Sequence, residues 1–232
     1  MSVTLRIRDV LPATPRARLV RIDLDGQRFF YQPGQALLIG THGYERRKPY
    51  SIASAPEDAE RSGYLELLVG VDAEGVAGPH FALRVGEPVD VDGPLGRFTF
   101  PAEPVERRFL FIAGGTGIAP LRAMMRHALR VPHDEVGLLY SARTPFEFAF
   151  EDEFRALASA GEINLRQTVT REAADTWQGT RGRIGQGDLA PLVHDPATLC
   201  FVCGPPALVA NIPKLLGELG IEPPRVRIEE WS

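Results

Sequence analysis

A glycine-rich turn between a buried strand and a helix constrains the fold of this chain more than any other feature of its sequence. Residues 108–113 (RFLFIA) have the composition of a buried strand, and residues 114–120 (GGTGIAP) follow directly. Apolar residues then recur at the spacing of one face of an amphipathic helix: Leu121, Met124, Met125, Ala128 and Leu129. A strand, a tight turn and a helix in this order begin a βαβ unit and predict a parallel sheet.

The same alternation continues through the rest of the sequence. Strands are predicted at residues 136–140, 163–169 and 199–202, and helices at residues 151–160 and 207–219. Strands that alternate with helices indicate an α/β domain, which we expect in residues 103–232.

The first hundred residues have a different pattern, of short strands separated by turns. Runs rich in β-branched and aromatic residues occur at positions 3–10, 17–23, 35–40, 64–71, 88–91 and 97–100. Turn residues such as Pro33-Gly34 and Gly93-Pro94 lie between them. Six short strands without a helical period predict a small antiparallel β-barrel in residues 1–102.

Composition and charge limit the class of protein. The chain has 232 residues, enough for two domains of ordinary size. A net charge of -4 argues against nucleic acid as the main partner, and no apolar run is long enough to span a membrane. Two cysteines give no disulfide framework, and with five scattered histidines they give no metal cluster. We therefore expect a cytoplasmic, monomeric enzyme without a metal.

The turn at residues 114–120 has the chemistry of a nucleotide site. Glycine lets the backbone approach a bulky anion, and the N–H groups at the start of a helix can hydrogen-bond a pyrophosphate. Pro120 suits the first helical turn. The segment is not the GxGxxG fingerprint, and the sequence contains no GxxxxGK[ST] phosphate loop, so a plain strand-to-helix turn is the alternative.

A second segment, residues 199–206 (LCFVCGPP), places two cysteines three residues apart. A redox CxxC pair is disfavoured, because residues three apart along a strand point to opposite faces. Cys203 is instead expected at the carboxyl end of a parallel strand, with Pro206 opening a helix, where open α/β sheets bind ligands. A small buried core cysteine is the alternative.

A third segment, residues 46–54 (RRKPYSIAS), places three cations beside an aromatic ring and two hydroxyls on an extended stretch. Cations suit a phosphate, and the face of Tyr50 can stack on a planar ring. A solvated run of charges leading into a strand is the alternative.

In this order, the three segments resemble the ferredoxin–NADP reductase superfamily, and the resemblance covers nearly the whole chain. Further matching segments are Pro33-Gly34-Gln35, Gly75-Val76-Ala77, Gly93-Pro94-Leu95-Gly96-Arg97-Phe98 and Glu229-Glu230-Trp231. The resemblance implies two domains: a six-stranded antiparallel Greek-key β-barrel that binds FAD, in residues 1–102, and an α/β domain with a parallel sheet that binds NAD(P), in residues 103–232.

The resemblance also implies the flavin contacts. Tyr50 would lie against the isoalloxazine ring, and Ser51 would hydrogen-bond near its N5. The other expected contacts are Lys48, Pro49, Leu68, Val69, Val71, Gly75, Val76 and Ala77. The family usually has arginine at the position of Lys48 and often serine at that of Gly78, so the tightness of FAD binding stays open.

For the nicotinamide nucleotide, the resemblance implies contacts from the glycine turn and from the cysteine segment. These are Gly115, Thr116, Gly117, Cys203, Gly204 and Pro205. Glu229 matches the family's near-terminal acid, and Trp231 matches the aromatic residue that covers the flavin. Ser51, Cys203 and Glu229 are the expected catalytic residues, with an exposed acidic tail as the alternative for Glu229.

Four residues after the parallel strands are expected near the ribose: Ser141, Arg143, Arg171 and Arg183. Arginines there suit a 2′-phosphate through bidentate contacts, and they favour NADPH. Arginine after the second strand also occurs in NADH-using relatives, so NADH stays open.

The implied function is an NAD(P)H-dependent flavoprotein reductase. It would transfer a hydride to FAD and then electrons to a separate acceptor, such as ferredoxin, flavodoxin or an oxygenase component. The four cysteines of a plant-type iron–sulfur module are absent, so an iron–sulfur acceptor would be another chain. The alternatives are a free-flavin reductase and an electron-transfer or regulatory subunit of a multi-chain oxygenase or dehydrogenase.

Overall fold

The computed structural model describes residues 2–171 and 177–230, and its internal contacts divide the chain into two compact units. The first, the barrel unit, contains the chain up to Ala102 together with Arg122–His127. The second, the α/β unit, contains Glu103–Leu121 and the chain from Ala128 onward.

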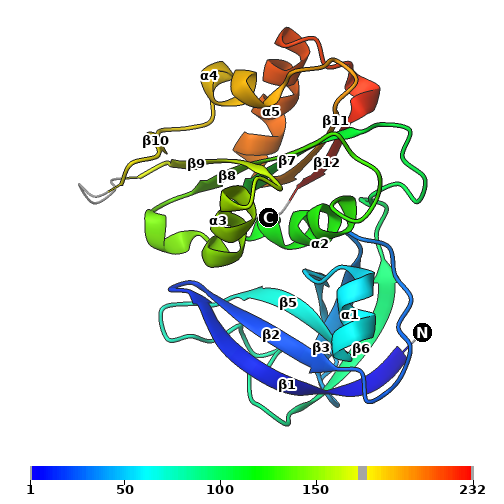
Figure 1. Ribbon diagram of the computed structural model, residues 1–232. Coiled ribbons are helices and arrows are strands. Elements are labelled where there is room, and N and C mark those ends of the chain that lie inside the picture. Colours follow the sequence, from blue (N-terminus) through cyan, green and yellow to red (C-terminus); the bar gives the residue numbers. More distant parts are fainter. Residues whose placement is uncertain (1, 172–176, 231–232) are drawn as a thin grey trace. The chain divides into compact units, whose positions relative to one another are not determined.

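The barrel unit is built from one antiparallel sheet that closes on itself (Figure 1). Its elements are β1 (Ser2–Thr14), β2 (Ala17–Asp23), β3 (Ala36–Thr41), β4 (Lys48–Ser51), α1 (Pro56–Ser62), β5 (Tyr64–Gly70) and β6 (Pro88–Leu95). The strand order is β4-β3-β6-β1-β2-β5. A bridge between Ile52, directly after β4, and Leu67 of β5 joins the two edge strands. This bridge closes the sheet into a barrel.

Side-chain alternation along the strands fills the barrel. In β2, Val20 and Ile22 are fully buried, whereas Arg21 between them is partly exposed. Leu37 and Ile39 of β3 belong to the same core cluster. One face of each strand therefore supplies the core, as the period of two in a strand requires.

Three details of the barrel differ from the sequence-based expectation. The predicted strand at residues 97–100 is wrong: Phe98 and Phe100 are buried, but the N–H of Phe100 donates to the Pro33 carbonyl at 3.0 Å and joins no ladder. The sixth strand is β4 instead. Gly93-Pro94, expected to be a turn, lies within β6 at a register shift against β3, a position that tolerates proline. Helix α1 was not predicted.

The α/β unit contains a six-stranded parallel sheet. Its elements are β7 (Arg108–Gly114), η1 (Gly115–Gly117), β8 (Glu135–Ala142), η2 (Pro145–Glu147), α3 (Glu151–Ser159), β9 (Asn164–Val169), β10 (Thr180–Arg181), α4 (Gln186–Leu189), η3 (Ala190–Leu192), β11 (Leu199–Gly204), α5 (Pro206–Glu218), η4 (Pro223–Arg225) and β12 (Val226–Glu230). Helix α2 (Ile118–Ala128) begins in this unit, and its residues Arg122–His127 group with the barrel.

The order of the parallel strands is β10-β9-β8-β7-β11-β12. Figure 1 shows α3 on one face of this sheet and α4 and α5 on the other. The chain moves outward from β7 to β10 and then returns to the other side of β7 as β11, so the strand order reverses between β7 and β11. Open α/β sheets bind ligands at the carboxyl ends of the strands beside such a reversal.

The predicted fold class is confirmed: an antiparallel six-stranded barrel, followed along the chain by an α/β unit with a parallel sheet. Strands β10 and β12 and helix α4 were not predicted. Within residues 2–171 and 177–230, the structure has no helix of the length and apolarity that a membrane crossing needs.

Candidate functional site

The carboxyl ends of β7 and β11 meet so closely that only glycine fits between them. A Cβ atom on Gly117 would lie 2.4 Å from the carbonyl oxygen of Cys203, and one on Gly204 would lie 3.1 Å from the Cα of Gly114. Cys203 is also in register with Ala113 of β7. The structure therefore brings together Gly117, Cys203 and Gly204, which the sequence placed in two separate motifs.

Beside this contact, the glycine turn is open. Gly115 and Thr116 are exposed, and a Cβ atom on Gly115 would meet no atom within 4 Å. Gly115 has φ +56, a left-handed conformation that glycine adopts without strain. The first N–H groups of α2 have no partner within the helix, and they carry the positive end of its dipole. The open turn therefore fits a phosphate or pyrophosphate group.

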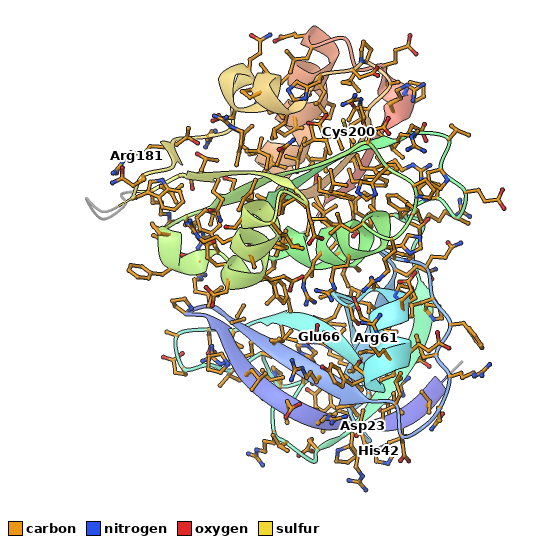
Figure 2. All side chains as sticks on the ribbon, viewed as in Figure 1. Asp23, His42, Arg61, Glu66, Arg181 and Cys200 are labelled. Atoms are coloured by element: carbon orange, nitrogen blue, oxygen red, sulfur yellow. The ribbon has the colours of Figure 1, made fainter. Side chains whose placement is uncertain are left out.

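The two cysteines lie on opposite faces of the sheet. Cys200, labelled in Figure 2, belongs to the core cluster that contains residues of α5, whereas Cys203 is one residue out of phase with that face. Burial raises the pKa of the Cys200 thiol to about 12, and neither cysteine is in a disulfide. This arrangement argues against a redox role for the CxxC pair.

Cys203 and the predicted acid, Glu229, lie in register on neighbouring strands. Glu229 of β12 is in register with Cys203 of β11, so both side chains leave the same face of the sheet. Cys203 is fully buried and Glu229 is half-buried. Pro205 is the exposed N-cap residue of α5. Trp231 lies outside the described residues.

The predicted ribose residues follow three neighbouring strands at one edge of the sheet. Ser141 of β8 is in register with Gly114. The N–H of Arg171, after β9, donates to the carbonyl of Arg143, after β8, at 2.9 Å. Arg183 follows Gly182, whose N–H donates to the carbonyl of Val169 at 2.8 Å. All three arginines are exposed, and none forms an ion pair with a described residue.

In the barrel unit, β4 holds the predicted flavin contacts. Lys48 and Pro49 are exposed, and Tyr50 is half-buried. Ser51 is 3% exposed, and its buried Oγ atom has no hydrogen-bond partner among the described residues. A buried hydroxyl without a partner costs about 1–3 kcal/mol, so Ser51 fits a ligand that supplies the missing hydrogen bond.

The ring of Tyr50 is held by a residue that the sequence analysis missed. The Tyr50 hydroxyl lies 2.9 Å from Nε2 of His80, and the two rings are within 12° of parallel. Burial raises the pKa of Tyr50 to about 12, and burial together with the charge of Lys48 lowers the pKa of His80. A neutral His80 therefore accepts the hydrogen bond of Tyr50. No motif signalled this pair, because thirty residues separate its members.

Arg47, one of the three cations in residues 46–54, forms ion pairs within the barrel unit. Its guanidinium pairs with Asp92 and, at 3.4 Å, with Asp90. Lys48 makes no ion pair with a described residue, so it is available to a phosphate as a point charge.

The remaining predicted flavin contacts lie on β5 and in the turn that follows. Val69 points into the barrel core, whereas Leu68 lies on the opposite face of the strand. Val71 is buried and Ala77 is half-buried. The turn at Gly75 and Val76 is closed by Asp72, whose Oδ1 atom accepts the Val76 N–H at 2.8 Å.

Arg18, a cation that the sequence analysis did not predict, lies beside this turn. Nη2 of Arg18 would be 3.1 Å from a Cβ atom on Gly75. Arg18 comes from β2, and its guanidinium also donates to the carbonyls of Thr14 and Ala17. The glycine therefore leaves room for an arginine next to the predicted phosphate contact.

Comparison with known proteins agrees with a flavin site in the barrel unit and a nucleotide site in the α/β unit. Residues 7–100 match the family model described as an oxidoreductase FAD-binding domain, and residues 111–214 match that of an oxidoreductase NAD-binding domain. The chain is 33% identical over 242 residues to ferredoxin–NADP reductase B of Sorangium cellulosum, covering 98% of this chain and 96% of the relative. It is 31% identical to NADH-cytochrome b5 reductase 1 of Scheffersomyces stipitis, covering 81% and 67%.

Solved structures give the same assignment. A cytochrome P450 reductase of Amycolatopsis superposes with a TM-score of 0.84 at 25% identity, covering 99% of this chain and 69% of that one. The cytochrome b5 reductase domain of Ulva prolifera nitrate reductase gives a TM-score of 0.83 at 25% identity, covering 99% and 97%. The open glycine turn and the buried, unpartnered Ser51 hydroxyl fit the two cofactors that the family models name. This chain therefore belongs to the ferredoxin–NADP reductase superfamily, and it is an FAD-dependent NAD(P)H oxidoreductase.

Proposed function

We propose that this reductase oxidises NADPH and passes the electrons through FAD to a separate acceptor protein: ferredoxin, flavodoxin or an oxygenase component. The observation that carries this proposal is the open glycine turn beside the Gly117–Cys203 contact, at the reversal of strand order. The likeness to a ferredoxin–NADP reductase supports ferredoxin as an acceptor class. A similar solved structure, named as the ferredoxin reductase in carbazole 1,9a-dioxygenase, supports an oxygenase component.

When bound, FAD would supply the redox chemistry, as the carrier between the hydride that NADPH gives up and the two electrons that the acceptor receives, with one proton released. The protein's part is binding and orientation. The Ser51 hydroxyl would hydrogen-bond the flavin, and the Tyr50 ring, fixed by His80, would lie against it. Cys203 and Glu229, which share one face of the sheet, would border the nicotinamide ring.

The preference for NADPH rests on the three arginines after β8, β9 and β10. Arg143 and Arg171 are joined through their backbones, and Arg183 follows the adjacent strand. Because no described carboxylate pairs with them, their guanidinium groups are available to a 2′-phosphate, a group that NADH lacks.

Replacing two of these arginines should change nucleotide preference rather than abolish activity. In Arg143→Ala/Arg171→Ala we expect the KM for NADPH to rise about 100-fold or more, since each substitution removes a hydrogen bond to a charged group and each such bond contributes about 1.5–3 kcal/mol. The KM for NADH should change by less than about threefold, because these contacts are absent with NADH. Steady-state kinetics with both nucleotides measures this, with Arg155→Ala as the control in the same unit. Equal changes for the two nucleotides would contradict the assignment.

A free-flavin reductase is the second candidate, and two observations favour it. Lys48 stands where the family usually has arginine, and Gly78 stands where it often has serine. The visible spectrum after gel filtration separates the two functions. A yellow protein that reduces ferredoxin with NADPH supports the first, and a colourless protein active only with added flavin supports the second. A flavoprotein that neither nucleotide reduces without a partner chain would instead be an electron-transfer subunit.

A further inference from the structure

Tyr140, near the carboxyl end of β8, joins two loops of the α/β unit through its hydroxyl. The side chain is fully buried, and its ring makes edge contacts with Phe148 and Phe154, at 5.0 and 6.3 Å between ring centroids. The hydroxyl donates to the Gly115 carbonyl at 3.1 Å and accepts the Ala149 N–H at 3.2 Å. One buried residue therefore connects the glycine turn after β7 with the end of the loop between β8 and α3.

The contact with Gly115 fixes the direction of the next N–H group. The Gly115 carbonyl also accepts the N–H of Ile118. In a trans peptide, the carbonyl and the N–H of the following residue point in opposite directions. The N–H of Thr116 must therefore point away from the Tyr140 hydroxyl. Gly115 and Thr116 are exposed, so this side of the turn is open to a ligand.

We propose that Tyr140 is a positioning residue for the nicotinamide nucleotide, holding the Gly115–Thr116 peptide so that the Thr116 N–H is presented to a phosphate. The inference rests on the proposed use of this turn by NAD(P)H. A donor that is already ordered binds more tightly, because ordering it no longer opposes binding. The contact with Ala149 holds the end of the loop between β8 and α3, which also contains Arg143.

The hydroxyl is suited to this task over the whole neutral pH range. Burial raises the pKa of Tyr140 well above its ordinary value, so the proton that it donates to Gly115 stays in place. Its ring is held by the two phenylalanines whether or not the hydroxyl is present. Phenylalanine at this position therefore removes the two hydrogen bonds and keeps the packing.

The test is Tyr140→Phe in the full-length flavoprotein. The Kd for NADP+ should rise about tenfold, which corresponds to the loss of about one hydrogen bond between the phosphate and the Thr116 N–H of the freed turn. The KM for NADPH should rise similarly and kcat should change by less than about twofold, the pattern of lost ground-state binding. The amide of Ala149 should also exchange its hydrogen faster. The matched control is Tyr31→Phe, a buried tyrosine of the barrel unit whose hydroxyl donates to the Ser54 carbonyl at 2.8 Å.

An unchanged Kd for NADP+ in Tyr140→Phe, with FAD content retained, would overturn the inference. An equal rise in the Kd for NADP+ in Tyr31→Phe would also overturn it, because the loss of nucleotide binding would then not be specific to Tyr140. If the proposed function itself is wrong, the wild-type protein binds neither NADP+ nor NAD+. That result is distinct from an effect of Tyr140→Phe.

Discussion

Gly117→Ala is expected to lower kcat/KM for NADPH by about 100-fold, the loss that a displacement of about 1 Å can cause at a reacting centre. The added Cβ would lie 2.4 Å from the Cys203 carbonyl oxygen, 2.6 Å from its carbon and 2.9 Å from the Gly204 nitrogen. All three are backbone atoms, so no side chain can rotate away, and the ends of β7 and β11 must separate. The expected cost in stability is about 1–3 kcal/mol, as for other overpacked sites.

Gly217→Ala is the matched control for this substitution. Gly217 lies in α5 of the same unit, and a Cβ atom there would meet nothing within 4 Å. Alanine inside a helix is about 1 kcal/mol more favourable than glycine, so this variant should keep full activity and unfold at an equal or higher temperature. Stopped-flow reduction by NADPH, with circular dichroism to check folding, measures both variants. A Gly117→Ala protein within threefold of wild-type activity would show that the close approach has no part in nucleotide use.

Arg122→Met should destabilise the barrel unit by about 3–5 kcal/mol, the usual result of removing one partner from a buried ion pair. Arg122 Nη1 lies 2.7 Å from Glu66 Oε2 and 2.9 Å from the Ala53 carbonyl, and both charged side chains are less than 10% exposed. Glu66, labelled in Figure 2, keeps a second cation, Arg21 at 3.1 Å, so the lower end of the range is expected. Urea unfolding followed by circular dichroism measures the change.

The control for this prediction is Arg155→Met. Arg155 is 57% exposed and pairs with Glu151 at the helix surface. Exposed pairs of this kind contribute at most about 0.5 kcal/mol. Equal effects of the two substitutions would show that the buried pair does not stabilise the barrel unit.

The same pair predicts how stability depends on pH. Burial alone would raise the pKa of Glu66, but the charge and hydrogen bonds of Arg122 and Arg21 outweigh it and hold this pKa below its ordinary value of 4.5. The contribution of Glu66 is therefore fully present above pH 4.5 and is lost as the pH falls through the lowered pKa. The difference in unfolding free energy between wild type and Arg122→Met should narrow below pH 4.5.

Local patterns were enough to predict most of the fold. Buried strands such as residues 108–113 and amphipathic helices such as residues 151–160 carry their period in consecutive residues. The failures have physical causes. Phe98 and Phe100 alternate like a strand and are buried, yet the N–H of Phe100 donates to the Pro33 carbonyl and no ladder forms. Strand β10 has only two residues, too few to show any period.

The site was predictable where its chemistry lies in one short segment. The glycine turn with Gly115 and Gly117 and the segment with Cys203 and Gly204 are of this kind, and the structure brings them together. His80 and Tyr140 were missed because their roles depend on partners distant in sequence. Tyr50 is thirty residues from His80, and Gly115 is twenty-five from Tyr140. A single sequence gives no sign of such pairs.

The central claim is that NADPH reduces FAD held by this chain, and anaerobic titration of the purified protein tests it most directly. One equivalent of NADPH should bleach the visible flavin absorbance completely. NADH should do so only at a higher concentration, because it lacks the 2′-phosphate that Arg143 and Arg171 would bind. Bound or added flavin that keeps its full absorbance with both nucleotides would contradict the account.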